Sequence, residues 1–181
     1  MKKFIILDRD GVINYDSDDY IKSPDEWVPI PGSLEAIVKL KQAHYQIAIV
    51  TNQSGVAQGL YTEATLALIH QKMQQMLAAW GVQIDIIFYC PHKTADNCAC
   101  RKPKPGMLQQ TAKHFNTELA DLFYIGDKKS DVDAAKAAGC KPVLVRTGYG
   151  EQTLLAHPQL DVPVFNNLAE AVEAILQGTL K

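Results

Sequence analysis

The segment Phe4-Ile5-Ile6-Leu7-Asp8-Arg9-Asp10-Gly11 joins four apolar residues directly to a charged, glycine-containing stretch. This pattern is typical of a buried strand of a parallel sheet that ends in a polar loop. Asp8 and Asp10 lie two residues apart at the strand end, so both carboxylates can reach one cation, or one can attack while the other transfers a proton. The alternative is an ordinary turn, in which Asp and Gly are common.

Further short apolar segments repeat this pattern and alternate with stretches of helical periodicity. The predicted strands are residues 4–7, 47–51, 84–89, 122–125, 142–145 and 162–164, and the predicted helices cover 34–41, 66–80, 107–115, 132–138 and 168–177. Thr62 and Ser130 are the expected N-caps of two of them. The alternation predicts an α/β fold, a doubly wound, Rossmann-like and mostly parallel sheet with right-handed crossovers. We expect residues 1–181 to form a single domain.

The composition is that of an ordinary globular protein, with 181 residues, 47% hydrophobic and 21% charged. Lys plus Arg number 18 and Asp plus Glu 20, which gives a net charge of −2 with no block of either sign. This balance gives no reason to expect a nucleic-acid or membrane partner. No apolar run has the length of a membrane span or a signal peptide, and no apolar stripe exceeds what the core requires. We therefore expect a cytoplasmic monomer.

In doubly wound sheets, ligands bind beyond the carboxyl ends of the strands, so the loops there should converge. The loop Thr51-Asn52-Gln53-Ser54-Gly55 offers a hydroxyl and backbone N–H groups to a phosphate. Lys102, in the loop 101–106, can offset phosphoryl charge, and Asp127, in the loop 126–131, can supply another oxygen to Mg²⁺. Taken singly, each loop also has an ordinary structural explanation. The loop 51–55 fits a polar connection between a strand and a helix, the loop 101–106 fits a solvated cationic surface, and Asp131 fits a helix cap.

Cys90, His92, Cys98 and Cys100 fall within eleven residues, whereas Cys140 stands alone. In a reducing compartment, such a cluster is more often a set of metal ligands than a pair of disulfides. Three thiols and one imidazole suit tetrahedral zinc. For Cys140 a packing role is favoured.

Taken together, the four loops resemble the haloacid dehalogenase (HAD) superfamily of phosphohydrolases. The matches are Asp8 and Asp10, Thr51, Lys102, and Gly126-Asp127 through Asp131, while Val12 replaces the threonine that is common after D-x-D-G. The zinc loop, residues 90–100, runs into Arg101-Lys102-Pro103 and narrows the resemblance to the branch of histidinol-phosphate and heptose-bisphosphate phosphatases. The resemblance supports structural Zn²⁺ on Cys90, His92, Cys98 and Cys100.

The resemblance also implies a mechanism. Asp8 would be the nucleophile and Asp10 the acid and base, while Thr51 and Lys102 would stabilise the phosphoryl oxygens. Mg²⁺ would be held by Asp8, the Asp10 backbone carbonyl and Asp127. The intervals 15–45 and 52–100 leave no room for a separate cap domain, so short loops must select the substrate, and the zinc should hold Arg101 beside Lys102.

The expected partner is a small sugar phosphate. Its binding residues are expected to be Asp16, Asp19, Tyr20, Asn52, Gln53, Ser54, Arg101 and Lys128. Arg101, Lys128 and Arg146 add positive charge beyond Lys102, which favours a substrate with a second phosphate. Within the branch, this implies hydrolysis of the 7-phosphate of D-glycero-D-manno-heptose 1,7-bisphosphate, in nucleotide-heptose and lipopolysaccharide core synthesis. The alternatives are histidinol phosphate as the substrate and a non-catalytic, zinc-stiffened binding module.

Overall fold

The predicted apolar strands assemble into one six-stranded parallel sheet with the order β3-β2-β1-β4-β5-β6. The computed structural model describes residues 3–180. Its strands are β1 (Lys3–Leu7), β2 (Tyr45–Asn52), β3 (Ile86–Cys90), β4 (Phe123–Gly126), β5 (Lys141–Val145) and β6 (Val164–Phe165). The predicted doubly wound α/β architecture is confirmed.

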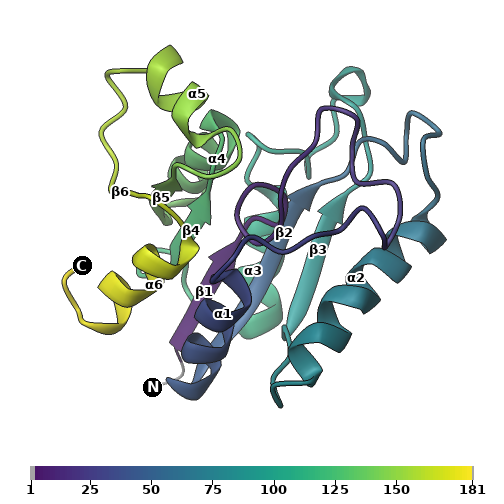
Figure 1. The fold of residues 1–181 in the computed structure, drawn as a ribbon. Helices are drawn as coiled ribbons and strands as arrows, with labels where there is room; N and C mark the ends of the chain where they lie inside the picture. Colours follow the sequence, from purple (N-terminus) through teal and green to yellow (C-terminus); the bar gives the residue numbers. More distant parts are fainter. Residues whose placement is uncertain (1–2, 181) are drawn as a thin grey trace.

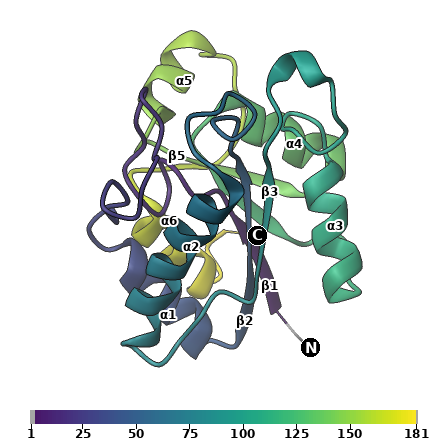
Figure 2. The ribbon, with the colours of Figure 1, turned by 90° about the vertical axis from the view of Figure 1, so that its right-hand side faces the viewer.

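Helices cover both faces of the sheet. They are α1 (Ser33–Gln42), α2 (Glu63–Ala78), α3 (Gly106–Phe115), α4 (Lys129–Ala138), α5 (Gly150–Ala156) and α6 (Leu168–Leu176), with a 3₁₀ turn at Thr94–Asp96. Figure 2 shows α1, α2 and α6 on one face and α3 and α4 on the other. Because side chains alternate along a strand, Ile5 and Leu7 pack in the core under α1, α2 and α6, and Ile6 packs under α3 and α4.

The start of α4 differs from the prediction. Ser130 is not the N-cap, because α4 begins at Lys129. Instead, the Asp131 carboxylate accepts hydrogen bonds from the backbone N–H groups of Lys128 at 2.9 Å and Asp127 at 3.1 Å. The prediction for α2 is confirmed, since the Thr62 hydroxyl accepts from the backbone N–H of Thr65 at 3.1 Å.

Two other elements also differ from the sequence expectation. Strand β6 lies at Val164–Phe165, slightly beyond the predicted 162–164. Helix α5 was not predicted, since it has only 7 residues and begins at a glycine. It lies beside the carboxyl edge of the sheet (Figure 1), where its Thr153 hydroxyl donates to the Asp127 carbonyl at 2.9 Å.

The order of the strands positions the site. Leu7, the last residue of β1, lies between Ile49 of β2 and Ile125 of β4. The loops that follow β1, β2 and β4 therefore leave the same edge of the sheet, at the point where the strand order reverses. Within residues 3–180, the connections from β1 to α1 and from β2 to α2 contain no helix or strand of a cap domain, and no helix is long and apolar enough to cross a membrane.

Candidate active site

Asp8 and Lys102 form a buried ion pair at the end of β1. Lys102 Nζ lies 3.0 Å from Asp8 Oδ1, and the backbone N–H of Arg9 donates to the same oxygen at 2.8 Å. Within residues 3–180, no hydrogen bond is made to Asp8 Oδ2. Because Asp8 lines the cavity described below, Oδ2 is the oxygen of this carboxylate that is open to a ligand there.

Asp131 fixes Lys102 from the other side. Lys102 Nζ lies 2.7 Å from Asp131 Oδ1 and donates to the Tyr124 hydroxyl at 2.9 Å, and that hydroxyl donates to Asp131 Oδ1 at 2.9 Å. Burial lowers the pKa of Lys102, but the carboxylates of Asp131 and Asp8 more than offset this, so the pKa lies above its usual value. Lys102 is thus held as a cation beside the Asp8 carboxylate.

The carboxylates of Asp8, Asp127 and Asp131 bring one oxygen each within 4.8 Å of one another. Burial and the nearby Asp131 raise the pKa of Asp8 to about 7, although Lys102 lowers it. Burial, with Asp131 and Asp8 nearby, raises the pKa of Asp127 well above its usual value. Three buried carboxylates beside Lys102, with Lys128 nearby but paired to Asp16, leave excess negative charge, which a divalent cation would offset.

The hydrogen bonds show which of these groups suit a cation. Asp127 Oδ1 is buried and has no hydrogen-bond partner within residues 3–180. Both oxygens of Asp131 are already used, by Lys102 and Tyr124 and by the N–H groups at the start of α4. Asp8 and Asp127 therefore fit a hard cation such as Mg²⁺ better than Asp131, which positions Lys102 and caps α4.

Two glycines make room for Asp127. A Cβ at Gly11 or at Gly148 would lie 2.3 Å from Asp127 Oδ2, and φ is +83° and +59° at these positions. The same carboxylate oxygen accepts the backbone N–H of Tyr149 at 2.7 Å. Glycine is required here because a side chain would displace the Asp127 carboxylate.

Asp10 is held by four donors. Arg9 donates from Nε to Oδ1 at 2.9 Å and from Nη2 to Oδ2 at 2.9 Å, Asn14 Nδ2 donates to Oδ1 at 2.8 Å, and Gln53 Nε2 donates to Oδ2 at 2.8 Å. Burial raises the pKa of Asp10, but Arg9 and the side-chain hydrogen bonds outweigh it, so the pKa lies below its usual value. Arg9 was missed from the sequence, because an arginine in a polar loop is normally exposed.

The last residues of β2 and the residue that follows it hold other side chains of the site in place. Thr51 is buried, and its hydroxyl accepts from Gln53 Nε2 at 2.9 Å. The Asn52 side chain pairs with the Lys102 backbone, accepting from N at 3.1 Å and donating to O at 3.2 Å. Asn52 and Gln53, expected to bind substrate, thus use their amides to hold Lys102 and Asp10 in place.

A cavity of about 480 Å³ opens over this cluster. It is lined by the predicted catalytic side chains Asp8, Asp10, Thr51 and Lys102 and by the predicted substrate-binding residues Asp16, Tyr20, Asn52, Gln53, Ser54, Arg101 and Lys128. Asp19 does not line it, because that residue is turned to solvent, and Asp18 lines it instead. Arg146 is also absent from the lining and pairs with Glu151 at 2.9 Å. Lys104 and Tyr149, which were not predicted, do line the cavity.

The loop after the D-x-D motif is tied across one side of the cavity. Lys128 Nζ lies 2.7 Å from Asp16 Oδ2 and 4.5 Å from the centre of the Tyr149 ring. The Tyr149 hydroxyl donates to Asp18. The carboxylates of Asp16 and Asp18 therefore already have partners.

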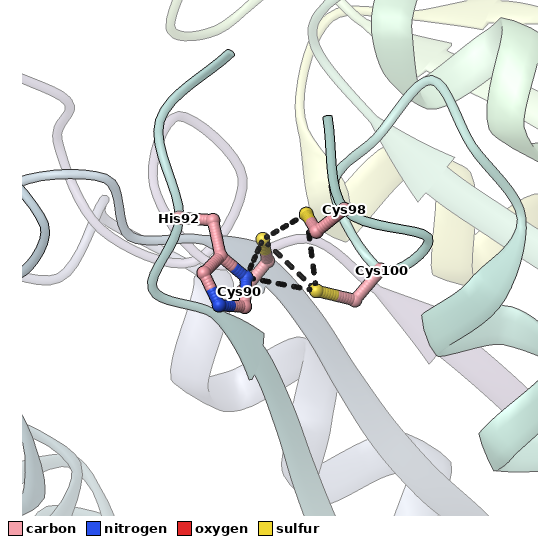
Figure 3. A group of neighbouring side chains, drawn as sticks. All are labelled: Cys90, His92, Cys98 and Cys100. Atoms are coloured by element: carbon pink, nitrogen blue, oxygen red, sulfur yellow. Dashed lines mark hydrogen bonds between the residues drawn. The ribbon is translucent and has the colours of Figure 1, made fainter. Parts of the chain in front are cut away.

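Cys90, His92, Cys98 and Cys100 converge as predicted (Figure 3). Cys100 Sγ lies 3.2 Å from Cys90 Sγ, 3.4 Å from Cys98 Sγ and 3.3 Å from His92 Nδ1. Four thiol or imidazole donors in a tetrahedron around zinc would be about 3.5–3.8 Å apart, since Zn–S bonds are about 2.3 Å long. The donor set fits zinc, and the donor-to-donor distances of 3.2–3.6 Å are slightly shorter than those around a bound zinc ion. Arg101 Nη1 donates to the His92 carbonyl at 3.1 Å, which links the cluster to the cavity.

Residues 99–171 match the family model of the HAD-hydrolase-like proteins. The chain is 48% identical to the D-glycero-β-D-manno-heptose-1,7-bisphosphate 7-phosphatase of Pseudomonas aeruginosa, over 97% of this chain and 99% of that protein. It is 50% identical to the protein of the same name from Bordetella bronchiseptica, over 99% of this chain and 98% of that protein. The chain belongs to the HAD-like hydrolases. The resemblance stated from the sequence is confirmed.

Solved HAD-like hydrolases share the fold closely. The crystal structure of D,D-heptose 1,7-bisphosphate phosphatase from Bordetella bronchiseptica, complexed with magnesium and phosphate, matches with a TM-score of 0.94 at 50% identity, covering 97% of this chain and 99% of that one. The corresponding phosphatase from Burkholderia thailandensis matches with a TM-score of 0.76 at 38% identity, covering 97% and 99%.

Proposed function

We propose that this HAD-like hydrolase removes the 7-phosphate of D-glycero-β-D-manno-heptose 1,7-bisphosphate in nucleotide-heptose synthesis for lipopolysaccharide core. The observation that carries the proposal is the buried Asp8–Lys102 pair beside the unpartnered Asp127 oxygen, in a chain 48–50% identical to phosphatases of that name. Residues 1–181 would act as one phosphatase domain, as a monomer. We place it in the cytoplasm, where the four cysteines stay reduced.

The reaction has two halves. In the first, Asp8 attacks phosphorus and the bond from phosphorus to the sugar oxygen breaks. Arg9 and its other donors keep Asp10 ionised in the free site, so the proton that Asp10 gives to the sugar oxygen is taken up from solvent when the substrate binds. In the second, Asp10, now a carboxylate, takes a proton from water while the water oxygen attacks phosphorus. The bond from Asp8 to phosphorus then breaks, and orthophosphate leaves.

The surrounding residues stabilise negative charge. Lys102, held between Asp8 and Asp131, and the Thr51 hydroxyl would bind the phosphoryl oxygens. Bound Mg²⁺, with Asp8, the Asp10 backbone carbonyl and Asp127 as its protein ligands, would reduce the repulsion between the nucleophile and the phosphate. Zn²⁺ in the Cys90, His92, Cys98 and Cys100 cluster would be structural, because four protein donors leave no open position for water.

The charge of the cavity favours a bisphosphate. Arg101 and Lys104 line the cavity, and neither has a carboxylate partner within residues 3–180. Their hydrogen-bond partners are uncharged oxygens, those of Asn97 for Lys104 and the His92 carbonyl for Arg101, so the positive charge of both side chains is not neutralised and can attract a second phosphate. Histidinol phosphate instead needs free carboxylates for its amine and imidazole, and those of Asp16 and Asp18 are engaged by Lys128 and Tyr149. A non-catalytic binding module would not need the buried charges around Asp8.

The test is phosphate release, with Mg²⁺, from heptose 1,7-bisphosphate, histidinol phosphate and simple monophosphates. We expect a clearly higher kcat/KM for the heptose bisphosphate, with heptose 1-phosphate as the product. Equal or faster hydrolysis of histidinol phosphate would contradict the substrate assignment. No phosphate release from any member of the panel would favour the binding module.

A further inference from the structure

The D-x-D motif of this chain contains an arginine with no solvent-exposed surface. Arg9 is 0% exposed, whereas the side chain of its partner Asp10 is 16% exposed and lines the cavity. The two nitrogens Nε and Nη2 contact the two oxygens of Asp10 at 2.9 Å each, which is a bidentate pair. Such a pair fixes the plane of a carboxylate as well as its place.

The third nitrogen of the guanidinium is held by α2. Arg9 Nη1 lies 3.0 Å from Nε2 of His70. A guanidinium can only donate, so His70 Nε2 must be the acceptor and its imidazole neutral. Burial, with the Arg9 cation beside it, also lowers the pKa of His70 to about 3, which agrees with a permanently neutral ring. Arg9 therefore cannot rotate away without losing contacts to both Asp10 and His70.

The opposite side of Asp10 is fixed by a second chain of contacts. Gln53 Nε2 donates to Asp10 Oδ2 at 2.8 Å, and Gln53 Oε1 accepts from the Tyr61 hydroxyl at 2.7 Å. Tyr61 packs against Gly55, where a Cβ would lie 2.2 Å from its ring. Asp10 is thus held between two supported donors, and neither Arg9 nor His70 lines the cavity.

We propose that Arg9, anchored by His70, is a positioning residue that aims the Asp10 carboxyl at the leaving-group oxygen. The inference rests on the proposed phosphatase function. It follows that Arg9 matters most when the leaving group needs a proton. A sugar alkoxide is a poor leaving group and needs one from Asp10, whereas p-nitrophenolate leaves without protonation.

The experiment compares kcat/KM for the heptose bisphosphate and for p-nitrophenyl phosphate in the Arg9→Lys and Arg9→Met variants. Lysine keeps the positive charge but cannot make the bidentate contact with the two oxygens of Asp10. Since positioned acid–base catalysis contributes about 10²–10⁴-fold, we expect both variants to lose at least about tenfold more activity on the sugar phosphate than on the aryl phosphate. A general structural defect would lower both values equally, and equal losses would overturn the inference.

Two substitutions at His70 test the inference independently, in case the Arg9 variants do not fold. His70→Gln keeps an acceptor for Arg9 Nη1, whereas His70→Leu removes it. We expect the selective loss on the sugar phosphate in His70→Leu and its rescue in His70→Gln, with KM for the sugar phosphate little changed. If the ratio of kcat/KM on the sugar phosphate to kcat/KM on the aryl phosphate were the same in His70→Leu and His70→Gln, the inference would be contradicted. The wild-type activity separates the two proposals, since a wild-type protein inactive on every sugar phosphate would instead remove the proposed function.

Discussion

Asp8 has one oxygen held by Lys102 and the backbone N–H of Arg9, and its other oxygen accepts no hydrogen bond within residues 3–180. Asp8→Asn keeps the volume and an acceptor for these donors but removes the nucleophilic anion. We expect turnover to fall by more than about 10⁴-fold, as when the nucleophile of other enzymes is removed. The circular dichroism spectrum should stay unchanged. Substantial residual turnover with Mg²⁺ would rule out the aspartyl-phosphate mechanism.

A substitution at a second single residue, Gly148, tests the proposed Mg²⁺ site. In Gly148→Ala the new Cβ would lie 2.3 Å from Asp127 Oδ2, and we expect a higher Mg²⁺ concentration for half-maximal activity. Strain at positive φ should also cost about 1–2 kcal/mol of stability. Gly81→Ala is the control, because its φ is +73° but nothing lies within 4 Å of the added Cβ. An unchanged Mg²⁺ requirement in Gly148→Ala would contradict the role of Asp127.

Among the structural elements, the zinc loop gives the clearest testable prediction, which concerns the metal content of the protein. Purified protein should contain one zinc per chain, and Cys98→Ser/Cys100→Ser should lose the metal and lower Tm by about 10 °C, since metal binding in such sites contributes to folding. Cys140→Ser is the control, as Cys140 is a free thiol outside the cluster and that variant should retain zinc. Protein prepared without chelator that contains no zinc would contradict the prediction.

The same loop positions Arg101 through the His92 carbonyl. In Arg101→Ala, we expect KM for the heptose bisphosphate to rise about 10- to 100-fold, the range for a lost charged hydrogen bond, and kcat to change little. KM for a monophosphate should hardly change. Lys93→Ala, an exposed lysine of this loop that does not line the cavity, is the control. A proportional loss on both substrates would show that Arg101 does not bind the second phosphate.

The sequence predicts the elements better than it predicts the contacts of polar side chains. The strands and the D-x-D, Lys102 and Asp127 positions follow from apolar runs that end in charged loops. The cap of α4 and the choice of Asp18 over Asp19 depend on local turns that several residues satisfy equally well. The burial of Arg9 can be predicted neither from the apolar runs nor from the local turns, because it depends on His70. His70 is 61 residues away in the sequence and is brought close only by the fold.

At the scale of the whole molecule, the exposed large apolar side chains come from different segments, and Tyr15 and Val28 form one neighbouring pair. Trp80, Leu68 and Leu155 are 48%, 53% and 80% exposed, and Leu155 belongs to α5, whereas Leu68 lies on α2. Single apolar residues and one such pair make a smaller apolar area than a dimer interface needs. We expect light scattering to give a single species of about 20 kDa, matching the mass of one chain at 20.0 kDa. A concentration-independent dimer would contradict this.

The pairing of β1 with β4 also affects how the chain folds while it is being translated. Leu7 lies opposite Ile125, so about 120 residues must be translated after β1 before its second neighbour exists. At about 5–20 residues per second, this takes on the order of 6–24 s. During that time the β1 edge of a nascent chain has no strand beside it, and an open apolar edge can pair with other chains. The β1 edge of a nascent chain therefore stays unpaired until β4 emerges, and the cluster of Asp8 with Asp127 and Asp131 cannot form before then.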